Sequence, residues 1–110
     1  MKKVIRDKFR NGVLERDGHK CKVCGDTISK IDAHHITNRN DMPNGGYVIE
    51  NGISLCDKPN GCHMKAEMFN KYTEIWIEKN MKECIGYDPG SLYKKIKSSY
   101  ELAYKKSERL

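Results

Sequence analysis

Two cysteine pairs constrain the fold of this chain more than any other feature. Cys21 and Cys24 form a CxxC turn, and Cys56 and Cys62 lie on a later loop that contains Pro and Gly. A CxxC turn offers two thiolates to one tetrahedral ion, and a second pair completes the four ligands of a closed Zn²⁺ site. A single CxxC is equally typical of a redox pair. The two pairs together predict a structural zinc site that ties the two loops together.

The composition favours a fold that depends on such a site. Of the 110 residues, 37% are apolar and 33% are charged, which leaves little material for a large core. The length is near that of one domain, so we expect a single domain over residues 1–110. Four buried, metal-free thiols are the alternative, but polar, turn-forming residues surround both pairs. The fifth cysteine, Cys84, is assigned no role.

The charge balance favours a polyanionic partner. The net charge is +6 and the pI is near 9.1, so nucleic acid is the first expectation and an acidic membrane surface the second. The basic residues of the N-terminal segment could meet phosphates or form a solvated face: Lys2, Lys3, Arg6, Lys8 and Arg10. No apolar run approaches the roughly 18 residues that cross a bilayer, and the N-terminus turns polar too early for a signal peptide. We therefore expect a cytoplasmic protein with reduced cysteines and no membrane partner.

The spacing of apolar residues predicts a helix near each end of the chain. An amphipathic helix is expected over residues 3–17, where Asp17 and Gly18 end it. A C-terminal helix is expected from about Ser91, its N-cap. The apolar positions are Val4, Ile5, Phe9, Val13 and Leu14 in the first helix, and Leu92, Ile96, Tyr100 or Ala103, and Tyr104 in the second.

The centre of the chain is predicted to be strand, loop, strand and helix. Residues 30–36 and 52–55 have strand patterns, and the intervening residues 37–50 are rich in Asn, Gly and Pro. The pattern becomes helical from Cys62 onward. The predicted fold class is α+β.

Three histidines and a glutamate fall on these central elements. His34 and His35 are adjacent on the first strand, and His63 and Glu67 are four apart on the helix, so they share one helix face. Successive strand side chains point to opposite faces, yet near a strand end one imidazole can bind a metal while its neighbour acts as a base. With His63 and Glu67, a divalent ion would have two or three N/O ligands and open positions for phosphate oxygen and water. This pattern favours phosphodiester hydrolysis.

The chain resembles the HNH endonuclease family over about residues 10–70. The matching blocks are Asp32-Ala33-His34-His35-Ile36, Asn51-Gly52-Ile53-Ser54-Leu55-Cys56 and Cys62-His63. The resemblance implies a small ββα-metal core around one divalent ion, stabilised by the four-cysteine zinc site and flanked by N- and C-terminal helices. The C-terminal helical extension would cover about residues 71–110. The gap between Cys56 and Cys62 is longer than the two residues usual in the family.

Carried over by position, the resemblance implies a role for each residue of the site. His34 and His63 would be metal ligands, and His35 the general base. Asn51 would steady the loop and the base through backbone hydrogen bonds, a role that a turn-forming Asn before Gly52 would share. Glu67 stands where many members place a further ligand, and an ordinary exposed helix glutamate is the alternative.

Three further expectations concern the surroundings of the site. Arg39, in the loop after the histidines, could clamp a phosphate through bidentate hydrogen bonds or could remain a solvated loop arginine. Asp32 could orient an imidazole. No second acidic cluster is evident near the site, which favours a one-metal mechanism over a two-metal one.

The expected function is a DNA endonuclease that uses structural Zn²⁺ and a catalytic Mg²⁺, Mn²⁺ or Ni²⁺. A small chain with lysine-rich flanks looks most like a phage or mobile-element nuclease, which would act in the cytoplasm of a bacterial host. DNA is the expected partner, with a homodimer or phage packaging proteins as further possibilities. The alternative is a noncatalytic zinc-ribbon module that binds DNA or protein, which would leave His34, His35, Asn51 and His63 unexplained.

Overall fold

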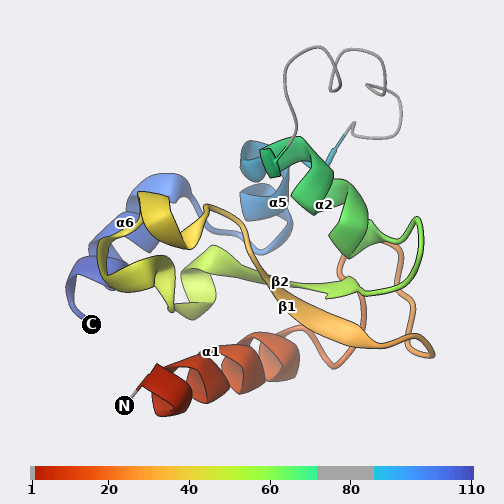
Figure 1. The fold of residues 1–110 in the computed structure, drawn as a ribbon, viewed down its shortest axis with the longest axis horizontal. Coiled ribbons are helices and arrows are strands. Elements are labelled where there is room, and N and C mark those ends of the chain that lie inside the picture. The colour runs from red at the N-terminus through yellow and green to blue at the C-terminus, as the bar shows by residue number, and fades with distance from the viewer. Residues whose placement is uncertain (1, 72–85) are drawn as a thin grey trace.

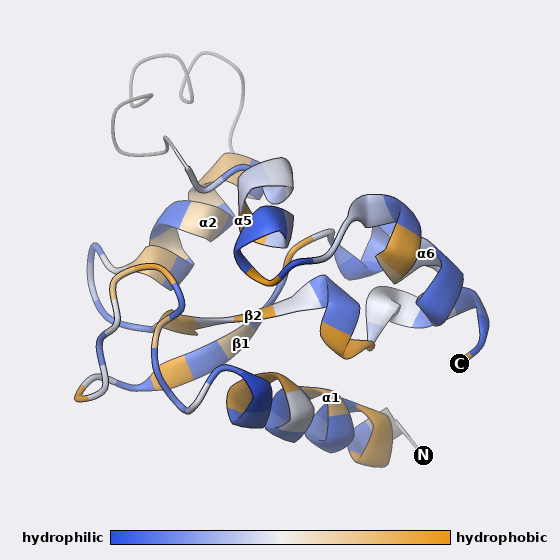
Figure 2. Ribbon diagram, turned by 180° about the vertical axis from the view of Figure 1, so that it is seen from behind, coloured by the Kyte–Doolittle hydropathy of each residue, from blue (hydrophilic) through white to orange (hydrophobic). Residues whose placement is uncertain are grey.

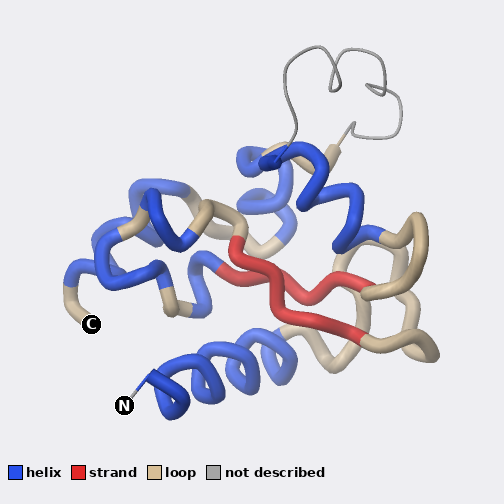
Figure 3. Tube along the Cα trace, viewed as in Figure 1, coloured by secondary structure: helices blue, strands red, loops and turns tan. Residues whose placement is uncertain are grey.

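A two-stranded antiparallel sheet lies at the centre of the computed structural model, which describes residues 2–71 and 86–110. The elements are α1 (Lys2–Arg16), β1 (Ile31–His35), β2 (Gly52–Cys56), α2 (Cys62–Lys71), α5 (Pro89–Lys95) and α6 (Tyr100–Glu108). Helix α1 lies on one side of the sheet, and α2 and α5 lie on the other (Figure 1). This arrangement is a small α+β fold, the predicted class (Figure 3).

Helix α1 closely matches the predicted N-terminal helix. It ends at Arg16, after which Gly18 adopts a φ of +72° that favours glycine. Hydrophobic and hydrophilic residues alternate along it (Figure 2), and Phe9, Val13 and Leu14 are buried. The apolar positions Val4 and Ile5 belong to the same predicted stripe but are 68% and 39% exposed. The cause is that the sheet packs on the middle and end of the helix, beyond its first turns (Figure 1).

A partly buried ion pair anchors the end of α1 to β2. The Arg16 guanidinium donates to both carboxylate oxygens of Asp17 at 2.9 Å, and to the Ile49 and Gly52 carbonyls at 2.6 Å. The backbone N–H of Ser54 donates to Asp17 Oδ2 at 2.9 Å. Asp17, expected only as a helix stop, therefore links the helix to the centre of the second strand.

The strand register places the two adjacent histidines on opposite faces of the sheet. His34 pairs with Ile53, and His35 pairs with Gly52. Directly paired residues share a face. His34 therefore faces the main core beneath α2 and α5, while His35 faces α1. That core is formed by Cys21, Ile36, Met42, Ile53, Leu55, Cys56, Cys62, Ala66, Leu92, Tyr93 and Ala103.

The long central loop is more ordered than its composition suggests. Short 3₁₀ turns occupy Arg39–Asp41, Pro43–Gly46 and Ile49–Asn51, between the two strands. The last two turns pack against α6. The loop is therefore held between the sheet and the C-terminal helix.

The C-terminal segment corrects the predicted single helix. Helix α5 begins after Asp88, whose side chain accepts a hydrogen bond from the Ser91 N–H, so Asp88 and not Ser91 is the N-cap. Lys97 then adopts a φ of +55°, and Ser99 caps a separate helix, α6. Of the predicted apolar stripe, Leu92 and Ala103 are buried, so Ala103 and not Tyr100 takes the alternative position, and Tyr104 is 39% exposed.

Two further points complete the fold. Residues 72–85 of the predicted C-terminal extension, with Cys84, lie outside the described residues. Among the residues that are described, no helix has the length and apolar character needed to cross a membrane.

Candidate metal-binding and active site

Four cysteine side chains converge where the two cysteine loops meet. Cys21 and Cys24 come from the turn after α1, Cys56 ends β2, and Cys62 begins α2. Their sulfur atoms all lie within 4.8 Å of one another, and Cys24 Sγ is 3.8 Å from Cys56 Sγ. Four sulfurs at about 2.3 Å from one tetrahedral ion would stand about 3.8 Å apart. The cluster can therefore hold a metal such as zinc.

Backbone and side-chain donors support charged sulfur at this cluster. The N–H of Cys24 donates to Cys21 Sγ at 3.5 Å, and that of Cys62 to Cys56 Sγ at 3.3 Å. The Tyr87 hydroxyl donates to Cys62 Sγ at 3.2 Å. Outside the cluster, Lys58 and Asp26 form a 2.9 Å ion pair that joins the two loops. These contacts resemble the outer shell that orients thiolate ligands.

The pKa values of the thiols differ because burial and hydrogen bonding compete. Burial acts to raise the pKa of Cys21, but backbone N–H groups, that of Cys24 first, outweigh it and lower the pKa to about 7. Burial raises the pKa of Cys62 to about 12, and neighbouring thiols add to the effect. Without a cation the four sulfurs cannot all be ionised at neutral pH. Metal binding at this cluster must therefore release protons.

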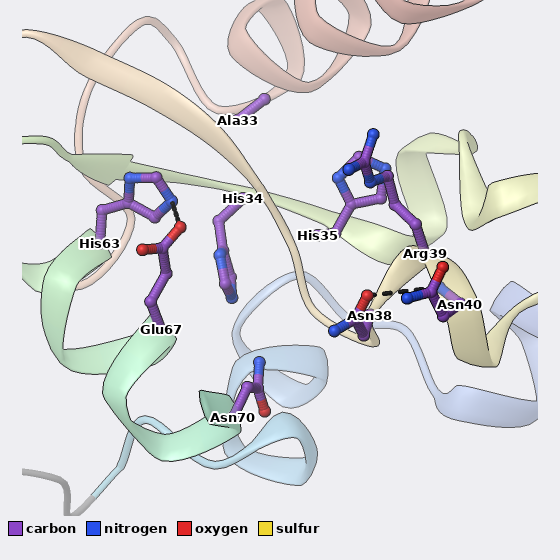
Figure 4. Close-up of a pocket in the computed structure, with 9 residues that line it drawn as sticks. All are labelled: Ala33, His34, His35, Asn38, Arg39, Asn40, His63, Glu67 and Asn70. Atoms are coloured by element: carbon purple, nitrogen blue, oxygen red, sulfur yellow. Dashed lines mark hydrogen bonds and ion pairs between the residues drawn. The ribbon is translucent and has the colours of Figure 1, made fainter. Parts of the chain in front are cut away.

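A second group of ligands lies between β1 and α2. One ligand atom from each of His34, His63 and Glu67 lies within 4.8 Å of the others, and His63 Nε2 is 3.2 Å from Glu67 Oε1. The rings of His34 and His63 are 5.2 Å apart. His63 and Glu67 point from one face of α2 toward His34 on the strand (Figure 4). Atoms bound at about 2.0–2.2 Å to one ion stand about 3–4 Å apart, so this N/N/O donor set fits a divalent cation.

Two aspartates approach His63 from its other side. Asp57 Oδ1 is 3.6 Å from His63 Nδ1, and Asp32, Asp57 and His63 also have ligand atoms within 4.8 Å of one another. The sequence prediction found no second acidic cluster near the site, and this is wrong because the strand pair brings Asp32 beside the start of the loop after β2. A carboxylate at Nδ1 leaves Nε2 directed at Glu67. Nothing in the sequence around Asp57, which follows Cys56, predicted its contact with His63.

An open cleft of about 460 Å³ brings together the predicted site residues other than Asn51 and the cysteines. It is lined by Ala33, His34, His35, Asn38, Arg39, Asn40, His63, Glu67 and Asn70. Figure 4 shows His63 and Glu67 on one side of His34, and His35 and Arg39 on the other. Asn70 was not predicted, although its place seven residues after His63 puts it near that face of α2. Asn38 and Asn40 belong to the loop and carried no periodic signal.

His35 is held between two aromatic rings. Phe9 of α1 stacks on it with ring centroids 4.4 Å apart, and Tyr47 meets it edge-on at 4.9 Å. Its Nε2 is buried and has no hydrogen-bond partner among the described residues. Burial, assisted by the charge of Arg39, lowers the pKa of His35 to about 4. The imidazole is therefore neutral at pH 7.

Asn51 lies away from the cleft and organises the loop that forms it. Its Oδ1 accepts from the Thr37 N–H at 3.0 Å and from the Tyr93 hydroxyl at 2.7 Å. Its Nδ2 donates to the Thr37 and Gly46 carbonyls at 3.1 and 3.2 Å. Both polar atoms of this buried amide are paired. Two of its partners, Thr37 and Gly46, belong to the loop that follows His35. Asn51 is thus a positioning residue that does not line the site.

Arg39 lines the cleft from the loop side. Its Nη1 donates to the Tyr47 hydroxyl at 3.0 Å, which ties the arginine to the ring that packs on His35. The guanidinium itself remains exposed. Arg39 is therefore both tethered and available to an anion in the cleft.

No family model, curated protein or solved structure matches this chain.

Proposed function

We propose that this chain is a metal-dependent DNA endonuclease of the HNH type, with a ββα-metal core formed by β1, β2 and α2. The observation that carries the proposal is the shared cleft. Three ligands suited to a divalent ion, a neutral histidine and an exposed arginine all line one open cavity. A noncatalytic zinc ribbon needs none of these side chains.

The ligand set proposed for the divalent ion is His34, His63 and Glu67, with Mg²⁺, Mn²⁺ or Ni²⁺ as the candidates. When bound, such an ion supplies charge neutralisation to a phosphodiester group. Asp57 supports this set because its carboxylate lies 3.6 Å from His63 Nδ1, which leaves Nε2 as the ligand nitrogen. The donor chemistry fits, because two imidazoles and one carboxylate suit these metals.

Other side chains of the cleft act as the general base and as the phosphate-binding group. His35 is the general base: its neutral imidazole takes a proton from the attacking water. Its unpaired, buried Nε2 is consistent with this role, since a buried polar atom without a partner calls for an explanation. Arg39 holds a phosphate oxygen through its exposed guanidinium. Asn51 keeps the loop between His35 and Arg39 in place from behind.

The four cysteines form a structural Zn²⁺ site in this proposal. The site ties the start of α2, which carries His63, to the end of β2 and to the turn after α1. Because the ligands come from both ends of the ββα unit, zinc binding and folding are expected to be coupled.

The test is cleavage of supercoiled plasmid by the purified, zinc-loaded chain with Mg²⁺, Mn²⁺ or Ni²⁺ added in turn. We expect nicking or linearisation that requires the added ion. His35→Asn should lower the rate at least about 100-fold, in line with the usual contribution of a general base. Glu67→Gln should require more of the ion to reach half-maximal rate.

His19→Asn is the matched control, because His19 is exposed, lies outside the cleft and has a positive φ that asparagine tolerates. It should cut at the wild-type rate. Circular dichroism and zinc content establish that each variant is folded. Intact plasmid with all three ions, from a folded and zinc-loaded chain, would support the noncatalytic zinc-ribbon alternative.

A further inference from the structure

Two further hollows lie beside the cleft, on the α1 side of the molecule. One, of about 220 Å³, is lined in part by Arg6, Arg10, His35 and Arg39. The other, of about 580 Å³, is lined in part by Arg6, Arg39 and Tyr47. Arg39 lines all three spaces, and His35 lines both the cleft and the smaller hollow. The three spaces therefore adjoin around Arg39, and we call them together the track.

The wall of this track is positively charged on the α1 side. Arg6 and Arg10 are four residues apart, so their side chains leave α1 on the same face. Both are exposed. Arg10 Nε is 3.9 Å from Asp32 Oδ1, a distance typical of a weak surface pair, and Arg6 has no ion-pair partner within residues 2–71 and 86–110. The two guanidiniums are thus available to an anionic ligand.

Arg6 and Arg10 face the track, whereas the neighbouring Lys8 does not. Lys8 belongs to the same helix and is equally exposed, but it lies two residues from each arginine, on the far side of α1 from the track. It lines none of the three spaces. If the helix bound DNA only through its overall positive charge, Lys8 would contribute as much as the arginines. If DNA follows the track, only Arg6 and Arg10 contribute.

We propose that Arg6 and Arg10 bind the phosphates next to the scissile one, so that a DNA strand runs from the cleft along α1. This proposal rests on the proposed nuclease function and assigns it a substrate path. A guanidinium is a planar fork that pairs with two phosphate oxygens, and the contact is independent of base sequence. The arginines hold the strand on the His35 side of the cleavage point and take no part in the chemistry.

The test is direct DNA binding, measured by fluorescence anisotropy with a labelled duplex in the absence of added divalent ion, at several KCl concentrations. Arg6→Gln and Arg10→Gln should each weaken binding about three- to ten-fold, irrespective of the duplex sequence. Each should also lower the slope of log K against log salt by about one. Lys8→Gln removes the same charge from the same helix and should stay within about two-fold of wild type.

Cleavage kinetics separate this inference from the nuclease function itself. In the plasmid assay each arginine variant should raise KM and leave kcat unchanged. If Lys8→Gln weakens binding as much as the arginine variants, or if none of the three does, the track is wrong while the nuclease function stands. If the chain cuts no DNA, the anisotropy comparison still decides whether the arginines bind it. Thermal melts of the three variants should match wild type, since all three positions are exposed.

Discussion

The Tyr93 hydroxyl donates a 2.7 Å hydrogen bond to Asn51 Oδ1 and lies 2.6 Å from Thr37 Oγ1. Because the single phenolic proton goes to Asn51, the Thr37 hydroxyl must donate to Tyr93. Through Tyr93, helix α5 thereby completes the hydrogen bonding of Asn51, the residue that holds the cleft loop. The C-terminal segment is in this sense part of the site, not only an extension of it.

We predict that Tyr93→Phe costs about 1–3 kcal/mol of stability, because the Thr37 hydroxyl loses its acceptor and Asn51 loses a donor in a buried place. Cleavage should slow as the loop that carries Arg39 loosens, while zinc content stays at the wild-type level. Denaturant unfolding and plasmid cleavage measure the two effects. Tyr104→Phe, which removes an exposed hydroxyl, is the control. Equal stability of the two variants would contradict the prediction.

A second prediction concerns Gly52, the strand partner of His35. An added Cβ would lie 2.5 Å from Val13 Cγ2 and 2.7 Å from the Phe9 ring, which stacks on His35. We expect Gly52→Ala to destabilise the chain by about 1–3 kcal/mol and to slow cleavage by displacing Phe9. Combining it with Val13→Ala should cost less than the sum of the two single changes, because the second removes the clash with Val13 and leaves only that with Phe9. Additive losses in denaturant unfolding would show that the added methyl group does not clash with Val13.

The sequence predicted the elements whose signals are local. The two cysteine pairs and the four-residue interval between His63 and Glu67 depend on short spacings, and the structure brings each set together. Alternation along β1 separates the neighbouring histidines, and only the cross-strand register shows that His35 meets α1. The sequence of β1 alone therefore could not tell which histidine faces which helix; the pairing with β2 was needed.

The contacts that were missed join residues far apart in sequence. Tyr93 and Asn51 are 42 positions apart, and Arg16 reaches carbonyls 33 and 36 positions away. No periodicity encodes such contacts, because they arise from how elements pack. Packing also explains the exposure of Val4 and Ile5, because an apolar stripe can extend beyond the surface that covers it.

A third prediction uses the pH dependence of the Asp17 carboxylate. Burial opposes its ionisation, but hydrogen bonds from Arg16 and Ser54 outweigh burial and lower the pKa below the ordinary value of 3.8. A group with a lowered folded-state pKa stabilises fully above the unfolded value, and this contribution is lost as the pH falls through the folded value. Asp17→Asn should therefore cost about 1.5–3 kcal/mol at pH 7 and progressively less below about pH 4.

Urea unfolding of wild type and Asp17→Asn at the same pH values measures this difference, and any loss of zinc common to both proteins cancels. Asp7→Asn, an exposed change in the same helix, should unfold like wild type at each pH. A difference that stays constant from pH 7 to pH 3 would show that the carboxylate charge does not stabilise the fold.

The fourth prediction separates the four clustered cysteines from the fifth. Cys56→Ser removes a fully buried sulfur from the cluster, so the variant should lose zinc and its cooperative thermal transition. Cys84→Ser should keep about one zinc per chain and melt like wild type, because four thiolates already complete a tetrahedral site. Metal analysis and calorimetry of the two variants decide the matter. If Cys56→Ser retains zinc and melts cooperatively, the cluster is not the structural metal site, and α2 with His63 is held in place by packing alone.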